Sequence, residues 1–152
     1  METQISRRVR ADTDLVFRLA AAVEDWPRIL PHYRWVKVRE ADGARRVVDM
    51  AARRDAIPVR WVAEQRVLPS EQRITFRHIG GITRGMEVAW TFAPQADGTV
   101  LVRIWHRFCP RWPLVPAWLV QRVVGNFFVD DIARKTLTRL AQLSEHMVAE
   151  RA

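Results

Sequence analysis

The sequence contains one cysteine, Cys109, and no hydrophobic run long enough to cross a bilayer. A lone cysteine excludes an internal disulfide framework and is typical of a reducing cytoplasm. The longest uncharged run, Trp112–Gln121, has about half of the roughly 20 residues that a transmembrane helix needs, so we expect no membrane span. The opening residues, Met1–Arg8, lack the apolar stretch of a signal peptide. Together these absences predict a cytoplasmic protein.

Lysine is nearly absent, because only Lys37 and Lys135 among the 25 basic residues are lysines. The others are arginines, and the formal net charge is +8. These arginines are scattered among predicted strands and interleaved with acidic residues, whereas nucleic-acid binding needs a basic stripe or patch. Nucleic acid is therefore not an expected partner. Two interpretations of the arginine content stay open: GC-rich codon usage, or a positive field that attracts an acidic protein partner.

Residue patterns for several other chemistries are also missing. The four histidines are dispersed and, with one cysteine, lack the spacing of metal ligands, so no metal is expected. The segment Gly80–Gly85 joins two predicted strands, whereas a nucleotide-phosphate loop joins a strand to a helix. The nucleophile elbow of a serine hydrolase is absent as well.

The middle of the chain is a succession of short strand-like segments with tight turns between them. Turn residues such as Asp42-Gly43 and Asp97-Gly98 separate these segments, which indicates an antiparallel meander. The predicted strands are Met1–Arg10, Tyr33–Glu40, Arg45–Arg53, Pro58–Leu68, Gln72–Ile79, Arg84–Ala93 and Thr99–Phe108.

Helical patterns lie on both sides of this meander. Asp12 or Thr13 can cap a first helix, and Trp26–Pro31 has the prolines of a helix barely one turn long. From about Pro116 to Val148 the apolar residues recur at helical spacing. Only Gly125 interrupts this last pattern, which predicts a bend or a close approach of another segment there.

These elements predict one α+β domain over residues 1–152. A curved antiparallel sheet of seven strands must cover its apolar face, and the long C-terminal helix is the available cover. A gap between sheet and helix is a candidate cavity. Flat apolar walls for it are available from the seven tryptophans: Trp26, Trp35, Trp61, Trp90, Trp105, Trp112 and Trp118.

Four pieces of the chain carry a resemblance to a known family. They are Val-Glu-Asp-Trp-Pro with a tyrosine after five further residues (Val23–Tyr33), Arg66-Val67, Val88–Phe92, and Asp97-Gly98-Thr99. Their order and spacing hold from about Thr3 to Glu145. By these pieces the chain resembles the polyketide aromatase/cyclase group of the START-like, helix-grip (Bet v 1-like) superfamily. The resemblance implies a seven-stranded curved antiparallel sheet around a long C-terminal helix, with two short helices after the first strand.

The resemblance also implies a function. Aromatase/cyclases of this group fold a poly-β-keto chain tethered to an acyl carrier protein, close a ring by aldol addition and remove water, without a cofactor. The alternative is a non-catalytic carrier of a quinone, lipid or polycyclic pigment, because the superfamily also contains such proteins. Carried over by position, the family's cavity arginine falls on Arg66, its cavity tyrosine on Tyr33 and its gate tryptophan on Trp26. Trp90 matches a cavity-region tryptophan.

The chemistry suits two of these residues. A guanidinium such as that of Arg66 can stabilise an enolate, and the Tyr33 hydroxyl can donate to a carbonyl or to a departing hydroxyl. Glu64 shares a strand face with Arg66 and is expected at the site as its partner. If the two pair, the arginine is partly neutralised.

Candidate bases and further cavity residues complete the predicted site. The candidate bases are His106, His78 and Asp131 of the adjacent pair Asp130-Asp131. One carboxyl of that pair can point into the cavity, where burial would raise its pKa. Asp130 and Asp131 are adjacent and cannot face the same way on a helix, and ion pairing of both at the cavity mouth is the alternative. Val124 and Phe128 are expected to wall the ligand from the long helix.

Overall fold

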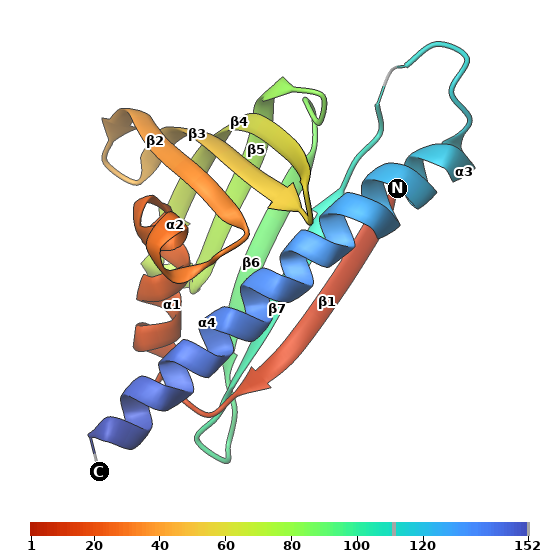
Figure 1. The fold of residues 1–152 in the computed structure, drawn as a ribbon. Coiled ribbons are helices and arrows are strands. Elements are labelled where there is room, and N and C mark those ends of the chain that lie inside the picture. Colours follow the sequence, from red (N-terminus) through yellow and green to blue (C-terminus); the bar gives the residue numbers. More distant parts are fainter. Residues whose placement is uncertain (111, 152) are drawn as a thin grey trace.

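The computed structural model describes residues 1–110 and 112–151. Its centre is one antiparallel sheet with the strand order β1-β7-β6-β5-β4-β3-β2, so that every neighbouring pair except β1–β7 is also consecutive in sequence (Figure 1). The strands are β1 (Glu2–Val9), β2 (Tyr33–Asp42), β3 (Arg45–Arg54), β4 (Ile57–Leu68), β5 (Arg73–Gly81), β6 (Glu87–Pro94) and β7 (Val100–Arg107). The predicted seven-stranded antiparallel sheet is confirmed.

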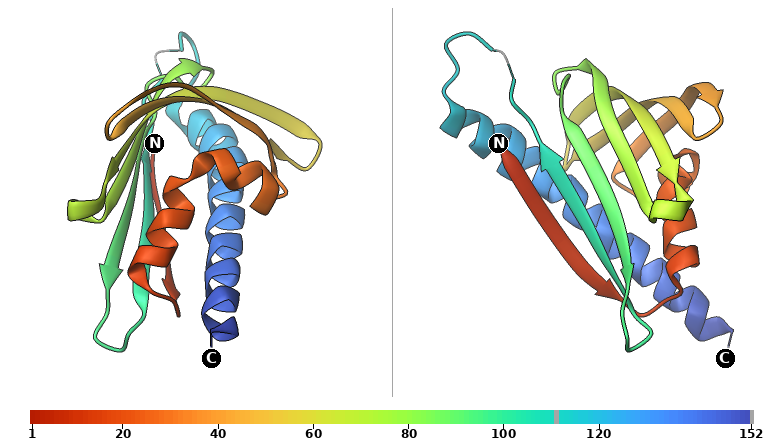
Figure 2. Two further views of the ribbon diagram at one scale, coloured as in Figure 1. Left: turned by 90° about the vertical axis from the view of Figure 1, so that its left-hand side faces the viewer. Right: turned by 180° about the vertical axis from the view of Figure 1, so that it is seen from behind.

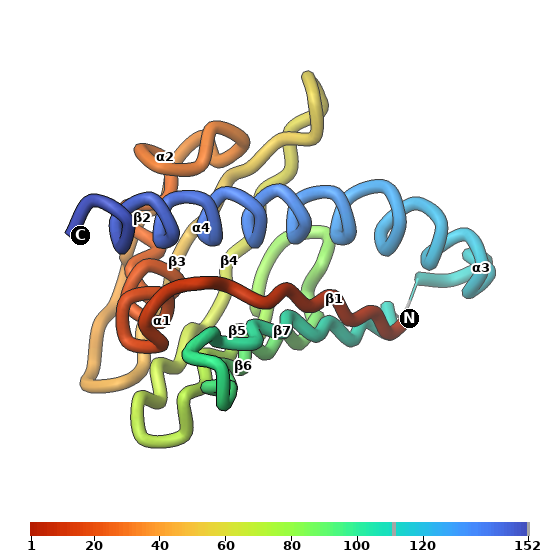
Figure 3. The backbone as a smooth tube through the Cα atoms, turned by 90° about the horizontal axis from the view of Figure 1, so that it is seen from below, coloured from red at the N-terminus to blue at the C-terminus, as the bar shows by residue number. Residues whose placement is uncertain are grey.

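The helices lie on one side of this sheet. α1 (Thr13–Ala21), the 3-10 turn η1 (Val23–Asp25) and α2 (Trp26–Ile29) connect β1 to β2, and η2 (Pro69–Glu71) is a single turn between β4 and β5. The sheet curves around the long C-terminal helix, as Figure 2 shows from two sides, and Figure 3 shows that helix running alongside β1. Its last segment, α4 (Asp130–Glu150), packs against β1, α1 and β3. None of the described helices is long and apolar enough to span a membrane.

The C-terminal helix is continuous and includes a wide turn at Gly125. α3 (Ala117–Val120) leads into the π-helical segment η3 (Gln121–Val129), which passes directly into α4. A Cβ atom at Gly125 would lie 3.0 Å from the Met1 sulfur and 2.8 Å from the Gln121 amide nitrogen. The expected close approach at Gly125 is therefore present. The N-terminus passes beside the helix where glycine leaves room for it.

Alternation along the strands decides which side chains reach the concave face. On β7, Val102, Ile104 and His106 are buried, whereas Arg103 and Arg107 between and beyond them are exposed. On β4 the buried residues on this face are Trp61, Ala63 and Gln65. A shift of one residue in these strands would exchange the two faces, so the register fixes the lining of the interior.

One predicted strand begins later than expected. β6 starts at Glu87, not Arg84, because residues 82–86 form the turn that joins it to β5. Gly81 and Gly85 both adopt a φ of +95°, and the Met86 amide donates to the Thr83 carbonyl oxygen at 3.0 Å. The glycines permit this left-handed backbone, and it ends the strand pattern.

We expect Leu140→Ala in α4 to lower the free energy of unfolding by about 2–5 kcal/mol, because it removes a fully buried side chain between helix and sheet. Urea unfolding at pH 7 measures the change. Leu114→Ala is the matched control, since Leu114 is fully exposed and its truncation should change the value by less than about 0.5 kcal/mol. Equal effects of the two substitutions would contradict the packing role of α4.

Candidate functional site

An internal cavity of about 90 Å³ lies between the concave face of the sheet and the C-terminal helix. Most of its lining is apolar or aromatic, and five polar side chains with hydroxyl or imidazole groups also reach it. The polar ones are Tyr33, His78, Thr83, His106 and Thr136, and the others are Trp26, Met50, Val59, Trp61, Phe76, Met86, Val88, Trp90, Ile104, Phe128, Val129, Ile132 and Ala133. No Arg, Lys, Asp or Glu of the described residues lines it. The interior chemistry is therefore that of neutral donors and acceptors.

Aromatic rings form one wall of the cavity around Trp26. The Trp26 ring lies edge-on to Tyr33 with centroids 5.0 Å apart, and 6.0 Å from Trp90. Tyr33 meets Trp61 at 6.1 Å, also edge-on, and Trp61 stacks on His78 at 5.6 Å with an interplanar angle of 11°. Edge-on and offset arrangements are the favoured geometries of such pairs, so these contacts hold the rings in place.

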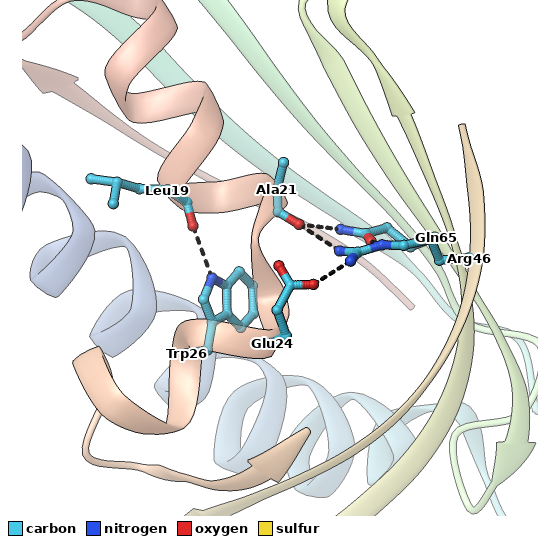
Figure 4. A network of polar contacts seen from close by, with 6 residues as sticks. All are labelled: Leu19, Ala21, Glu24, Trp26, Arg46 and Gln65. Carbon is cyan, nitrogen blue, oxygen red and sulfur yellow. Dashed lines mark hydrogen bonds and ion pairs between the residues drawn. The ribbon is translucent and has the colours of Figure 1, made fainter. Parts of the chain in front are cut away.

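The Trp26 ring is fixed by the turn that carries it. Its indole nitrogen donates to the Leu19 carbonyl oxygen at 3.1 Å (Figure 4). Pro27 supplies the φ angle of the first turn of α2. Beside it, Gln65 of β4 donates to the Ala21 carbonyl oxygen at 3.0 Å and accepts a bond from Arg46 at 2.9 Å. These bonds tie the end of α1 to the sheet and position Trp26 over the cavity.

Tyr33, the first residue of β2, is a buried phenol that lies near Thr136 of α4. Burial raises its pKa far above the ordinary value, so the hydroxyl keeps its proton and remains a donor at all working pH values. Thr136 partly offsets this rise in the pKa of Tyr33, and the Thr136 hydroxyl donates to the Ile132 carbonyl oxygen at 2.7 Å. Thr136 also bonds with the His32 ring at 2.8 Å. These bonds hold Thr136, and Thr136 and Tyr33 both line the cavity.

His78 and His106 form a second polar group in the cavity. The His78 Nδ1 atom bonds with the Thr83 hydroxyl at 2.7 Å, which orients that ring from the β5–β6 turn. Burial lowers the pKa of His78 to about 3, with His106 adding to the effect, and burial lowers the pKa of His106 to about 4. Both imidazoles are therefore neutral at pH 7. Among residues 1–110 and 112–151, no hydrogen-bond partner holds the His106 ring, so it is free to bond with a bound molecule.

A family model described as "Polyketide cyclase / dehydrase and lipid transport" matches residues 9–140 of the chain. The chain belongs to this family. The match begins at Val9, the last residue of β1, and ends about halfway along α4, so it includes every residue that lines the cavity.

Solved structures of similar fold include aromatase/cyclases. The Zhui aromatase/cyclase from a Streptomyces species superimposes with a TM-score of 0.86 at 17% identity, over 97% of this chain and 95% of that one. The di-domain aromatase/cyclase StfQ of the steffimycin biosynthetic pathway gives a TM-score of 0.74 at 20% identity, over 98% of this chain and 46% of that one. A major latex-like protein from Panax ginseng gives a TM-score of 0.78 at 12% identity, over 95% of this chain and 97% of that one. At these identities the likeness shows the helix-grip fold.

The predicted cavity position of Arg66 is wrong in this family member. β4 alternates so that Trp61, Ala63 and Gln65 face the interior, and Arg66 lies on the outer face. The Arg66 side chain is 55% exposed and its Nε atom donates to Glu64 at 3.0 Å. Glu64 also accepts from Arg45 at 2.9 Å, and that bond chiefly lowers the pKa of Glu64. Arg66 and Glu64 therefore pair with each other on the outer face of the sheet, which is the pairing that the sequence analysis left open. Neither residue lines the cavity.

Two predicted residues of the C-terminal helix also lie outside the lining. Asp131 pairs with Lys135 at 2.9 Å and with Arg54 at 3.9 Å instead of pointing into the cavity, and Asp130 pairs with Arg134 at 3.1 Å. This is the ion pairing that the sequence left as the alternative. Val124 is buried in η3 but is not among the lining residues, because η3 passes beside the N-terminus and the cavity lies nearer Phe128.

The structure brings six of the predicted site residues together around one space: Tyr33, His106, Trp26, His78, Trp90 and Phe128. Sequence reasoning missed Thr136, which bonds with His32 from 104 positions away, and no local pattern links residues so far apart. It also missed Thr83, which bonds with His78 across the β5–β6 turn only five positions away. The sequence analysis did not single out Trp61 among the seven tryptophans. The alternation of Trp61, Ala63 and Gln65 along one strand could have placed it on the inner face. No cluster of three or more His, Cys, Asp or Glu that could hold a metal occurs in the described part of the chain.

The neutral buried histidines predict a loss of stability in acid. The unfolded chain protonates a histidine near pH 6.5, whereas the folded protein does so only near pH 4 at His32 and His106 and near pH 3 at His78. Between these values the unfolded state binds more protons, so stability falls as pH falls, by about 1.4 kcal/mol per pH unit for each histidine. We expect His78→Gln to reduce the slope between pH 6 and pH 4.5 by that amount in urea unfolding. His146→Gln, at an exposed position on α4, should leave the slope as it is.

Proposed function

We propose that the protein is a cofactor-independent cyclase and dehydratase that closes and dehydrates a ring of a poly-β-keto intermediate inside this cavity. The observation that carries the proposal is the placement of an imidazole without a protein partner, His106, in the same aromatic-walled cavity as the protonated phenol Tyr33. Aldol cyclisation needs one group that removes a proton and one that donates to the carbonyl oxygen. The cavity supplies one of each.

His106 is the proposed base. Its lowered pKa keeps the imidazole in the free-base form at pH 7, so every molecule is ready to accept a proton. A methylene between two ketones is acidic enough for a weak base. The imidazole takes that proton, the resulting enolate carbon bonds to a ketone carbon further along the chain, and the ketone oxygen becomes an alkoxide. The imidazolium returns this proton to the alkoxide, which gives the hydroxyl of the aldol product. The imidazole then removes the second proton of the former methylene carbon and passes it to the hydroxyl, which leaves as water while the carbon–carbon double bond forms, so the residue is regenerated.

Tyr33 is the proposed donor to the ketone oxygen. The edge-on contacts of its ring with Trp26 and Trp61 hold the phenol in place, so its hydrogen bond is available without reorganisation as negative charge develops. The surrounding tryptophan rings exclude bulk water, which strengthens the interaction and favours loss of water from the aldol product. An acidic acyl carrier protein is the proposed donor of the substrate, since the chain carries a net charge of +8.

A cavity of about 90 Å³ is smaller than the roughly 300–1,000 Å³ of pockets for drug-sized ligands. A multi-ring or long poly-β-keto ligand therefore requires movement of lining side chains. Phe128, Val129 and Ile132 lie on the helix side of the cavity, and Val59 with Trp61 lies on β4 opposite. We propose that rearrangement of these side chains, with the sheet unchanged, admits the substrate.

We expect His106→Asn to reduce cyclised product from a carrier-bound polyketide by about a hundredfold or more, because the reaction loses its base. Product analysis by liquid chromatography and mass spectrometry separates aromatised from uncyclised and misfolded shunt products. Two controls are matched: His146→Asn removes an exposed histidine, and Arg66→Ala removes an outer-face arginine. Both should stay within about twofold of wild type. A product mixture from wild type equal to that formed in buffer would contradict the enzyme function.

The second candidate function is a carrier of a hydrophobic ligand, and the absence of any charged side chain from the described cavity lining favours it. Tyr33→Phe distinguishes the two. In the cyclase it should lower ring formation by about tenfold or more while ligand binding, followed by tryptophan fluorescence quenching with polycyclic phenols, stays within about twofold. In a carrier, no product distribution changes with either Tyr33 or His106, and affinity follows apolar volume alone.

A further inference from the structure

A second concavity, of about 340 Å³, lies outside the cavity on the molecular surface. It forms where the segment before β2, the end of β3 and α4 meet, and the Arg53 amide fixes that junction by donating to the His32 carbonyl oxygen at 2.9 Å. Its lining residues are Pro31, His32, Arg53, Asp55, Lys135 and Arg139. We call it the Arg53–Arg139 concavity.

The charges around this concavity are unbalanced. Three permanent cations and one carboxylate line it, and that carboxylate, Asp55, already pairs with Arg54 at 3.4 Å. Lys135 bonds to Asp131 at 2.9 Å. Arg53 and Arg139 form no ion pair with any carboxylate in residues 1–110 and 112–151. Two guanidinium groups that pair with no carboxylate therefore face one hollow, and their mutual repulsion makes a bound anion favourable there.

The chemistry of the lining selects the kind of anion. Guanidinium groups bind phosphate oxygens through paired N–H donors, and Lys135 adds a compact positive charge. Burial and the nearby Lys135 lower the pKa of His32 to about 4, so its ring is neutral at pH 7. The ring adds a polar surface that carries no charge to the concavity. The volume exceeds that of a bare phosphate ion, so there is room for a group esterified to it.

We propose that the Arg53–Arg139 concavity binds the phosphate of a phosphate ester. It lies back to back with the cavity: His32 lines the concavity, its ring bonds with the Thr136 hydroxyl at 2.8 Å, and Thr136 lines the cavity. One layer of side chains thus separates the two spaces. The anion site does not require the proposed reaction.

Calorimetric titration of the full chain at low salt tests the proposal with three probes: 4′-phosphopantetheine, pantetheine and inorganic phosphate. We expect phosphopantetheine to bind at least tenfold more tightly than pantetheine, which differs from it only by the phosphate. The double variant Arg53→Gln and Arg139→Gln should weaken that binding at least tenfold. The double variant Arg53→Lys and Arg139→Lys should weaken it less, because the positive charge is kept. If inorganic phosphate binds as tightly as phosphopantetheine, the anion site is supported, with free phosphate as its ligand.

The matched control is the pair Arg103→Gln and Arg107→Gln, which removes two exposed arginines from the outer side of β7 with the same change in net charge. This control should leave the dissociation constant of phosphopantetheine within about twofold of the wild-type value. Loss of binding in this control as large as in the Arg53/Arg139 variant would overturn the proposal in favour of a diffuse positive field. Absence of binding by either phosphate probe would overturn it as well. Circular dichroism confirms that the compared variants are folded, and none of these readouts depends on turnover.

Discussion

The packing of the C-terminal helix against the concave face of the sheet is the interaction on which the rest of the structure depends. A seven-stranded sheet curved this strongly has an apolar inner face that only a long element can cover, and α4 meets β1, α1 and β3 along that face. Burial of Leu137, Leu140 and Ala141 supplies the hydrophobic free energy for the contact. The cavity is the space that this packing leaves open near Phe128, so fold and site have the same origin.

Burial then sets the chemistry of the interior. Desolvation keeps His78 and His106 neutral and keeps the proton on Tyr33, so the cavity contains donors and acceptors without fixed charge. The charged residues of the same strands and helix instead pair with one another on the outer surface, as Glu64 does with Arg45 and Arg66. This separation favours chemistry on a substrate that is itself neutral and weakly acidic. It also leaves cationic surface, including the Arg53–Arg139 concavity, available for an anionic group.

Strand alternation explains both the success and the failure of transferring site residues by resemblance. Tyr33 and His106 occupy inward positions, and the resemblance or the residue type found them. Arg66 was transferred as the cavity arginine, but it is one position away from the inward Gln65, and one position on a strand reverses the face. In this chain a buried amide takes the inward position, bonded to Ala21 and Arg46, so the interior has no guanidinium among its described lining residues.

The sequence by itself determined the elements and their order, since turn pairs such as Asp97-Gly98 and the change of hydrophobic period after Phe108 are local signals. It also determined that Tyr33, Trp26 and Trp90 belong near a cavity, because those positions match a family pattern. Only the tertiary structure decided which faces meet. Thr136 lies 104 positions after His32 yet bonds with it, and Asp131 pairs with Lys135 and Arg54 on the surface. Such contacts depend on the path of α4 across the sheet, which no local pattern of residues specifies.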